Sequence, residues 1–503
     1  MKIRDQIAII PFVLYMLFWW LVKLNELPGL HGDEAWVGIM AIKIGKEGFT
    51  YLKPMNNYTG TLQTFFSWLS FEIFGSGVAQ LRYVGILFNF INIIAVTYLL
   101  SVFNIKNLQF FFLLIVSQST FFLVSPRIAW EVNSFTFCLI SLQLIAIYRL
   151  QIDTGKAYQF WLVLFFAINI LGTYNHIIFS CASISGWVGL LLWKMNQKSN
   201  RYDSYIFIGF SNLINLITIF LLMRYSIISN YILSSVILLI LIIYIEVVIL
   251  SKANHYQLPS GTKHNIRKPL LFLMIIGVSI FVYFHGFTLF QIIANYKILT
   301  HVFSYEPHPL VLYIFIALAT LYLVLFLKYV IKDFFNVEGS ILPYVIITYM
   351  CMINLYTLET SFRYYLTLFF LISLYMSYKF SLSYKYRWLI TFLLFTNFSL
   401  VNYSMINIFW FREKMIKPVH FSLGIGKTET SAHFLPTSPV VNYLRANKTM
   451  NFSTLGESFF IEKPIFFYYL TQPWEVSSKK TINISYDYTK YGTGFSITGV
   501  KKQ

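Results

Sequence analysis

Long apolar stretches, separated by short polar ones, run along most of the chain. Runs such as 7–24, 110–124, 310–327 and 388–400 contain almost no charged residues. With their flanks, most approach the roughly 20 residues that an α-helix needs to cross a bilayer. The pattern predicts an α-helical polytopic membrane protein with about thirteen transmembrane helices. They are expected near 7–24, 81–101, 108–125, 132–149, 158–173, 176–194, 204–222, 231–250, 270–288, 310–328, 341–357, 364–380 and 387–405.

Basic residues favour one side of these predicted spans. If the N-terminus is cytoplasmic, every inner loop contains Lys or Arg, for example Lys106, Arg149 and Lys328. Cytoplasmic loops of membrane proteins carry such an excess. The odd number of spans then places the segments 25–80 and 406–503 on the extracytoplasmic face.

Those two outer segments differ in character. In 25–80, "WVGIMAIKIGKEG" and "TLQTFFSWLSFEIFG" predict two helices that lie in the membrane interface. Residues 406–503 are richer in Pro, Thr, Ser and Gly; "SPVVNYLRANKT" predicts a helix and "TINISYDY" a strand. The expected division is a transmembrane domain, 1–405, followed by a small extracytoplasmic α/β domain, 406–503.

Composition supports the assignment to membrane proteins and argues against nucleic acid as a partner. Of 503 residues, 57% are hydrophobic and 12% charged, against roughly a quarter charged in soluble domains. The net charge of +18 follows from the basic inner loops and a basic C-terminal segment suited to anionic lipid headgroups. Blocks of like charge are absent, so nucleic acid is not an expected partner. The three cysteines all fall within predicted spans, so no disulfide framework is expected.

Two adjacent carboxylates follow the first span. Asp33 and Glu34 lie in "LHGDEAW", and a chain with so few charges is expected to place such a pair in a cavity at the membrane surface. The alternative is that Asp33 caps the helix that follows.

Further polar residues lie at the same predicted face. "SPRIAWEVNS" contains Arg127 and Glu131, and "LETSFRYYLTLFF" contains Glu359 and Arg363; either pair could instead form a local ion pair of small energy. The middles of the spans contain almost no ionisable groups, whereas transporters of charged solutes place such groups near the midplane. The distribution therefore indicates chemistry at the membrane surface.

A metal site is a weaker expectation. Glu306 and His308 in "SYEPHPL" are candidate ligands, although histidines beside Pro in surface loops are more often ordinary loop residues. A divalent Mg, Mn or Zn ion stays an open possibility, since no ligand spacing is diagnostic.

Four features of the chain form a recognisable set: the adjacent acids after the first span, "FEIFGSGVAQLRYVGILF", "SPRIAWE" and "SFRYYLTLFF". In these features the chain resembles the GT-C glycosyltransferases, within them the group of protein O-mannosyltransferases and lipid A aminoarabinose transferases. "NYLRANKTMNFSTLGESFFIEKPIFFYYL" resembles the small outer domain of the aminoarabinose type. Two departures stand out: "NNYTGTLQTFFSW" lacks the prolines that many relatives have there, and Glu131 replaces the Asp that relatives often have in the second outer loop.

The resemblance implies an inverting hexosyl- or pentosyltransferase that takes its sugar from a polyprenyl-phosphate donor. The acceptor is a lipid, a glycan or a protein. Asp33 matches the family's base, and Glu34 or Glu131 would orient Asp33 or the acceptor. Arg363, Arg127 and Lys53 are the candidates for binding the donor phosphate, since cations there stabilise the departing lipid phosphate.

The resemblance also implies a bacterial inner membrane, with the active site facing the periplasm or exterior. Two alternatives stay open. A non-catalytic carrier or flippase of lipid-linked sugars would line its spans with charges, and an O-antigen polymerase or ligase usually places its key residues in a large late loop.

Overall fold

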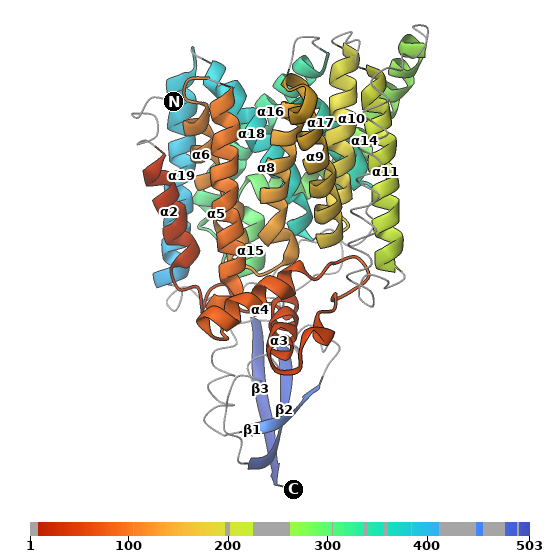
Figure 1. The fold of residues 1–503 in the computed structure, drawn as a ribbon. Helices are drawn as coiled ribbons and strands as arrows, with labels where there is room; N and C mark the ends of the chain where they lie inside the picture. Colours follow the sequence, from red (N-terminus) through yellow and green to blue (C-terminus); the bar gives the residue numbers. More distant parts are fainter. Residues whose placement is uncertain are drawn as a thin grey trace.

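The structure is a computed structural model, and most of its described residues form one bundle of helices. It describes residues 9–103, 105–196, 202–224, 262–303, 305–335, 340–355, 361–383, 385–411, 449–455, 478–489 and 492–502. The helices of the bundle run side by side, and α3 (Gly32–Glu47) and α4 (Leu62–Phe74) lie at one end of it (Figure 1). The bundle consists of α2 (Ile10–Leu21), α5 (Val78–Val102), α6 (Leu108–Ser117), α8 (Glu131–Ile152), α9 (Gly155–Asn175), α10 (Phe179–Asn196), α11 (Tyr202–Arg224), α14 (Thr262–Ile293), α16 (Pro309–Phe335), α17 (Leu342–Ile353), α18 (Leu366–Leu382) and α19 (Arg387–Trp410).

The protein is an integral membrane protein. Among the described residues, seven helices are long and apolar enough to cross a bilayer, or eight if one bent pair is a single span. Every predicted span overlaps a described helix except 231–250, which lies outside the described residues. The count of thirteen stays a prediction.

The bent pair corrects the continuous helix expected over 108–125. α6 ends at Ser117 and α7 (Thr120–Val124) begins after a bend of 73°. Asn295 makes the break possible, because its Oδ1 accepts hydrogen bonds from the backbone N–H of Thr120 (2.8 Å) and from its hydroxyl (3.1 Å). Backbone groups freed within a membrane need such partners.

Helices α8 and α18 form the centre of the bundle. In their most apolar stretches, 72% and 83% of the residues are buried, against 22% for α14 and α16, which face outward. Aromatic side chains fill this centre; Phe122 stacks on Phe369 with ring centroids 5.1 Å apart. Because lipid tails are as apolar as these side chains, close packing between helices holds such a core together.

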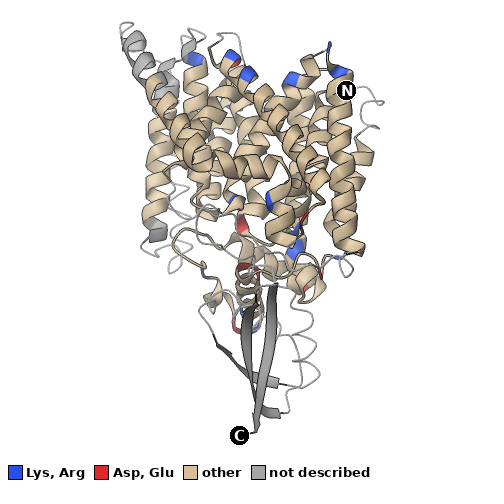
Figure 2. Cartoon of the chain, turned by 180° about the vertical axis from the view of Figure 1, so that it is seen from behind, with Lys and Arg blue, Asp and Glu red and all other residues tan. Residues whose placement is uncertain are grey.

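Charged residues are found at both ends of the bundle. Several Lys and Arg lie at the end where the N-terminus is, opposite α3 and α4, and others lie near α3 and α4, where Asp and Glu are mainly visible (Figure 2). The interfacial helices predicted within 25–80 correspond to α3 and α4.

Three strands follow the bundle in sequence. β1 (Thr449–Leu455) pairs in parallel with β2 (Ser478–Thr489), and β2 pairs antiparallel with β3 (Gly492–Lys502). The strand expected from "TINISYDY" falls within β2, whereas the helix expected from "SPVVNYLRANKT" lies outside the described residues except for Thr449, which begins β1. The division at residue 405 stays a prediction; α19 extends to Trp410.

Candidate functional site

The adjacent carboxylates lie in the first turn of α3. His31 precedes the helix, and its Nδ1 accepts a hydrogen bond from the N–H of Asp33 at 3.0 Å. The carboxylate of Glu34 accepts from the N–H of His31, also at 3.0 Å, which completes a capping box. The cap is therefore His31, and the alternative that Asp33 caps the helix is wrong. The side chain of Asp33 is left available for other partners.

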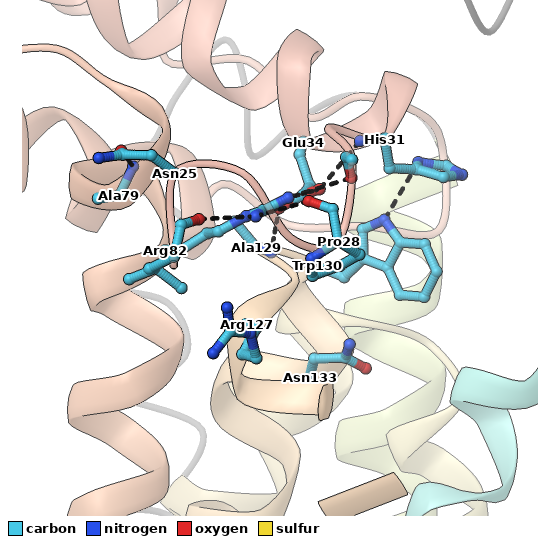
Figure 3. Close-up of polar contacts among 12 residues, drawn as sticks. Asn25, Pro28, His31, Glu34, Ala79, Arg82, Arg127, Ala129, Trp130 and Asn133 are labelled. Atoms are coloured by element: carbon cyan, nitrogen blue, oxygen red, sulfur yellow. Dashed lines mark hydrogen bonds and ion pairs between the residues drawn. The ribbon is translucent and has the colours of Figure 1, made fainter. Parts of the chain in front are cut away.

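Glu34 forms a buried pair with Arg82 of α5. Nε and Nη2 of Arg82 donate to the two carboxylate oxygens, each at 3.0 Å, and both side chains are fully buried (Figure 3). Glu34 also accepts from the N–H of Ala129 at 2.8 Å. The other Arg82 donors reach the carbonyls of Leu24, Pro28 and Gly29 at 2.9 to 3.2 Å.

The hydrogen bonds of this pair connect the start of α3, helix α5 and the backbone at Ala129. The carboxylate of Glu34 accepts four hydrogen bonds, and all five N–H groups of the guanidinium are used. Such a carboxylate has no capacity left for a substrate. The geometry favours a structural role for Glu34, which holds α3 on the bundle; the role in orienting Asp33 or the acceptor, which the resemblance implies, stays a prediction.

Arg127 likewise holds neighbouring backbone segments in place. It lies in η2 (Ser125–Arg127), is fully buried, and donates to the carbonyls of Trp19, Val22 and Leu27. Its guanidinium also lies over the ring of Phe409, 4.9 Å from the centroid. These partners engage most of the guanidinium, and the phosphate-binding role expected for Arg127 stays a prediction.

Asp33 instead pairs with Arg363. Oδ2 of Asp33 lies 3.0 Å from Nη1 of Arg363, and the two side chains are 28% and 11% exposed. Arg363 belongs to η3 (Phe362–Tyr365), directly before α18. The sequence predicted both residues for the site, and the structure brings them together.

Aromatic rings hold the guanidinium of Arg363 in place. It lies 4.7 Å from the ring centroid of Trp130 and 5.3 Å from that of Tyr364. Trp130 is fixed in turn, because its indole N–H donates to Nδ1 of His31 at 3.3 Å (Figure 3). Nε of Arg363 is buried and has no hydrogen-bond partner among the described residues. Arg363 thus retains donor capacity beside a partly exposed carboxylate.

Glu131 and His176 lie behind this ion pair. Glu131 begins α8, and its Oε1 is 3.8 Å from Nε2 of His176, in the turn between α9 and α10. Both side chains are buried. The ring of His176 also contacts those of Tyr364 and Tyr58, with centroids 5.4 and 5.5 Å away.

Sequence reasoning missed His176 and Arg82. The signal available for each was an ionisable residue at the end of an apolar run, but no spacing linked either to the acidic pair. We call Asp33, Glu131, His176, Arg363 and Tyr364 the Asp33 cluster.

Other predicted site residues do not join the cluster. Lys53 is exposed in the segment between η1 (Phe49–Tyr51) and α4, and it forms no ion pair with a described carboxylate. Nδ1 of His308 accepts from the N–H of Leu310 at 3.3 Å, at the start of α16, and Glu306 is exposed. Glu359 lies outside the described residues. Within the described ranges, no group of three or more His, Cys, Asp or Glu is placed to hold a metal ion.

The cluster combines two chemical abilities. The partly exposed carboxylate of Asp33 can accept a proton, and the preorganised guanidinium of Arg363 can bind an oxyanion. Both groups lie at the end of the bundle crossed by α3 and α4, and the side chain of Asp33 is partly exposed there.

No protein-family model and no curated protein matches the sequence. Two solved structures, both of ArnT from Cupriavidus metallidurans, are similar in fold. The apo structure shares 12% identity over 74% of this chain and 77% of that chain, with a TM-score of 0.35. The structure bound to undecaprenyl phosphate shares 11% identity over 95% of this chain and 93% of that chain, with a TM-score of 0.43.

Proposed function

We propose that the protein is an inverting membrane glycosyltransferase. It moves a sugar from a polyprenyl-phosphate donor to a lipid, glycan or protein acceptor. The observation that carries the proposal is the ion pair of Asp33 and Arg363, which places a candidate base within 3.0 Å of a candidate phosphate ligand. Both lie at one end of an apolar helical bundle.

The reaction needs one general base and no general acid. The acceptor oxygen or nitrogen attacks the anomeric carbon, the bond from that carbon to the phosphate oxygen breaks, and the acceptor's proton passes to Asp33. Lipid phosphate is a good leaving group, so no carboxylic acid has to protonate it, unlike in glycoside hydrolysis. A single displacement of this kind inverts the anomeric centre.

Arg363 supplies the positive charge that the departing phosphate requires. Its guanidinium can bind two phosphate oxygens, and stacking on Trp130 and Tyr364 fixes its orientation before the donor arrives. Fixed cations stabilise developing negative charge without reorganisation during the reaction. Since Arg363 already neutralises Asp33, donor phosphate bound there would also free the base.

The architecture suits a donor whose tail stays in lipid. The positive-inside rule supports a cytoplasmic location for the end of the bundle opposite α3 and α4, and hence an extracytoplasmic location for the Asp33 cluster. For a bacterial inner membrane this is the periplasm. Undecaprenyl phosphate, bound in one of the similar ArnT structures, belongs to the proposed class of lipid carrier; the proposal itself rests on Asp33 and Arg363.

The test is a transfer assay with the full chain in detergent. Radiolabelled polyprenyl-phosphate sugars are each incubated with a crude lipid and glycan extract, with and without EDTA. Appearance of labelled acceptor supports the proposal and names the sugar, and its loss with EDTA would add a divalent metal. If no sugar is transferred but the protein reconstituted in vesicles moves donor between leaflets, the carrier function replaces the proposal.

A further inference from the structure

Glu131 and His176 present two buried ionisable atoms to each other. Oε1 of Glu131 and Nε2 of His176 are 3.8 Å apart, and neither has a hydrogen-bond partner among the described residues. Leaving such groups unpaired is costly in a low-dielectric interior. The atoms are nonetheless close enough for a small side-chain rotation to join them by a hydrogen bond.

The backbone determines the tautomer of His176. Its Nδ1 accepts a hydrogen bond from the N–H of Ile178 at 3.1 Å, so Nδ1 carries no proton. The neutral ring therefore carries its proton on Nε2, which faces Glu131. Protonating Nδ1 would set two N–H groups against each other. Burial, together with the positive charge of Arg363, lowers the pKa of His176 well below its ordinary value.

An additional proton would therefore be held by Glu131. Once a small rotation joins the two atoms, the Nε2–H of His176 would donate to the carboxyl group whether that group is charged or neutral, and His176 would so act as a positioning residue. The arrangement separates two roles among the carboxylates: Asp33 is 28% exposed and can exchange a proton with a substrate, whereas the side chain of Glu131 is only 5% exposed.

The charges that face Glu131 come from several elements. Arg363 from η3 and Asp33 from α3 both act on it electrostatically. His176 from the α9–α10 turn lies beside it, and Tyr364 and Tyr58 contact His176 as neutral phenols. With both carboxylates ionised, the cluster has two negative charges and one positive charge. A phosphodiester bound to Arg363 would add a third negative charge.

We propose that Glu131, held in place by His176, takes up one proton from solvent when a phosphodiester binds to Arg363. The inference rests on the proposed function. It adds how the site limits its negative charge when the donor phosphate binds. Proton uptake removes one of the like charges near the phosphate. Proton uptake has a second effect during transfer. Breaking the bond to the anomeric carbon turns the phosphodiester monoanion into a phosphomonoester, which carries a second negative charge. A neutral Glu131 limits the repulsion at that step.

The test measures proton uptake directly. The full chain in detergent is titrated with a short-chain prenyl methyl phosphodiester, whose acidic group stays ionised throughout the measurement. Isothermal calorimetry in buffers of different ionisation enthalpy gives the number of protons bound per ligand. We expect about one for the wild type at neutral pH, and a dissociation constant that rises about tenfold per pH unit where uptake is complete.

Three variants assign the proton. Glu131→Gln should bind the probe with no proton uptake and a flat pH dependence. His176→Gln, whose amide can still donate to Glu131, should keep the uptake, whereas His176→Phe should lose it. Glu26→Gln removes an exposed carboxylate outside the cluster and should behave as wild type. Thermal unfolding confirms that each variant is folded.

The outcomes separate the two proposals. Undiminished proton uptake in Glu131→Gln, or probe binding without uptake in the wild type, overturns the role of Glu131 and leaves the phosphate site standing. Failure of the wild type to bind the probe at any pH overturns the phosphate site itself, and the proton uptake with it.

Discussion

Oδ2 of Asp33 lies 3.0 Å from Nη1 of Arg363, although 330 positions separate the two residues in the chain. The ion pair joins the first outer segment to the start of α18. It also means that the candidate base and the candidate phosphate ligand neutralise each other in the absence of substrate. Donor phosphate therefore has to compete with Asp33 for Arg363, which orders the binding of donor before activation of the acceptor.

Replacing Arg363 tests the phosphate site. Arg363→Gln removes the positive charge while keeping a polar side chain, and we expect kcat/KM for the donor to fall by about 10²- to 10³-fold, as for the loss of a preorganised charge-stabilising donor. Arg363→Lys keeps the charge but loses the two-pronged geometry, so its loss should be intermediate. Steady-state kinetics with varied donor measures both, and wild-type values for Arg363→Gln would exclude the assignment.

The pair of Arg82 and Glu34 is predicted to be structural. Arg82→Met leaves the buried carboxylate of Glu34 without its partner, and breaking a buried pair in this way costs about 3–5 kcal/mol of stability. The double variant Arg82→Met, Glu34→Leu should regain much of that loss. Thermal unfolding in detergent compares them with Glu26→Gln. A stable Arg82→Met variant that has lost only activity would instead indicate a direct role in the reaction.

The segment before α4 is predicted to depend on Gly60. The N–H of Gly60 donates to the carbonyl of Asn175 at 3.0 Å, and a Cβ at this position would lie 2.4 Å from the carbonyl oxygen of Tyr174. Gly60→Ala should therefore separate the segment from the turn that holds His176, at a cost of roughly 1–3 kcal/mol, and lower transfer activity.

Gly286→Ala is the control for this change. The nearest atom to its added Cβ would be a methyl of Val282 at an ordinary 3.7 Å, so stability and activity should be retained. Equal behaviour of the two alanine variants would show that the contact with Tyr174 does not matter.

Acidification is predicted to destabilise the fold through His176. Its pKa is lowered in the folded protein, mainly by burial, whereas the unfolded residue binds a proton below about pH 6.5. The unfolded state then binds more protons than the folded one, so the free energy of unfolding falls as the pH drops, by at most about 1.4 kcal/mol per pH unit. His176→Gln should show a smaller slope in thermal unfolding between about pH 7.5 and 5.5. An unchanged slope would assign the effect to other groups.

The apolar pattern predicted most helices because a bilayer admits few other spanning structures. It did not predict the break after Ser117, since the compensating residue, Asn295, lies on a distant segment. At the site, residue types and their positions near span ends predicted Asp33, Glu131 and Arg363, and the structure pairs Asp33 with Arg363.

The partners of these residues could not be predicted from sequence spacing. Spacing reveals neighbours along one helix, whereas Glu34 and Arg82 are 48 positions apart, and Arg127 contacts carbonyls rather than Glu131. The local ion pair considered for Arg127 and Glu131 gave way to contacts between segments that only the folded chain brings together.

Transfer by Asp33→Asn, beside the wild type and with the donor identified by the transfer assay, tests the proposed mechanism most directly. Asn cannot take the acceptor's proton, so transfer should fall by about 10²- to 10⁴-fold. Donor binding should persist or tighten, because Arg363 is released from its ion pair. If Asp33→Asn transfers sugar as fast as the wild type while folding normally, Asp33 is not the base and the proposed mechanism is wrong.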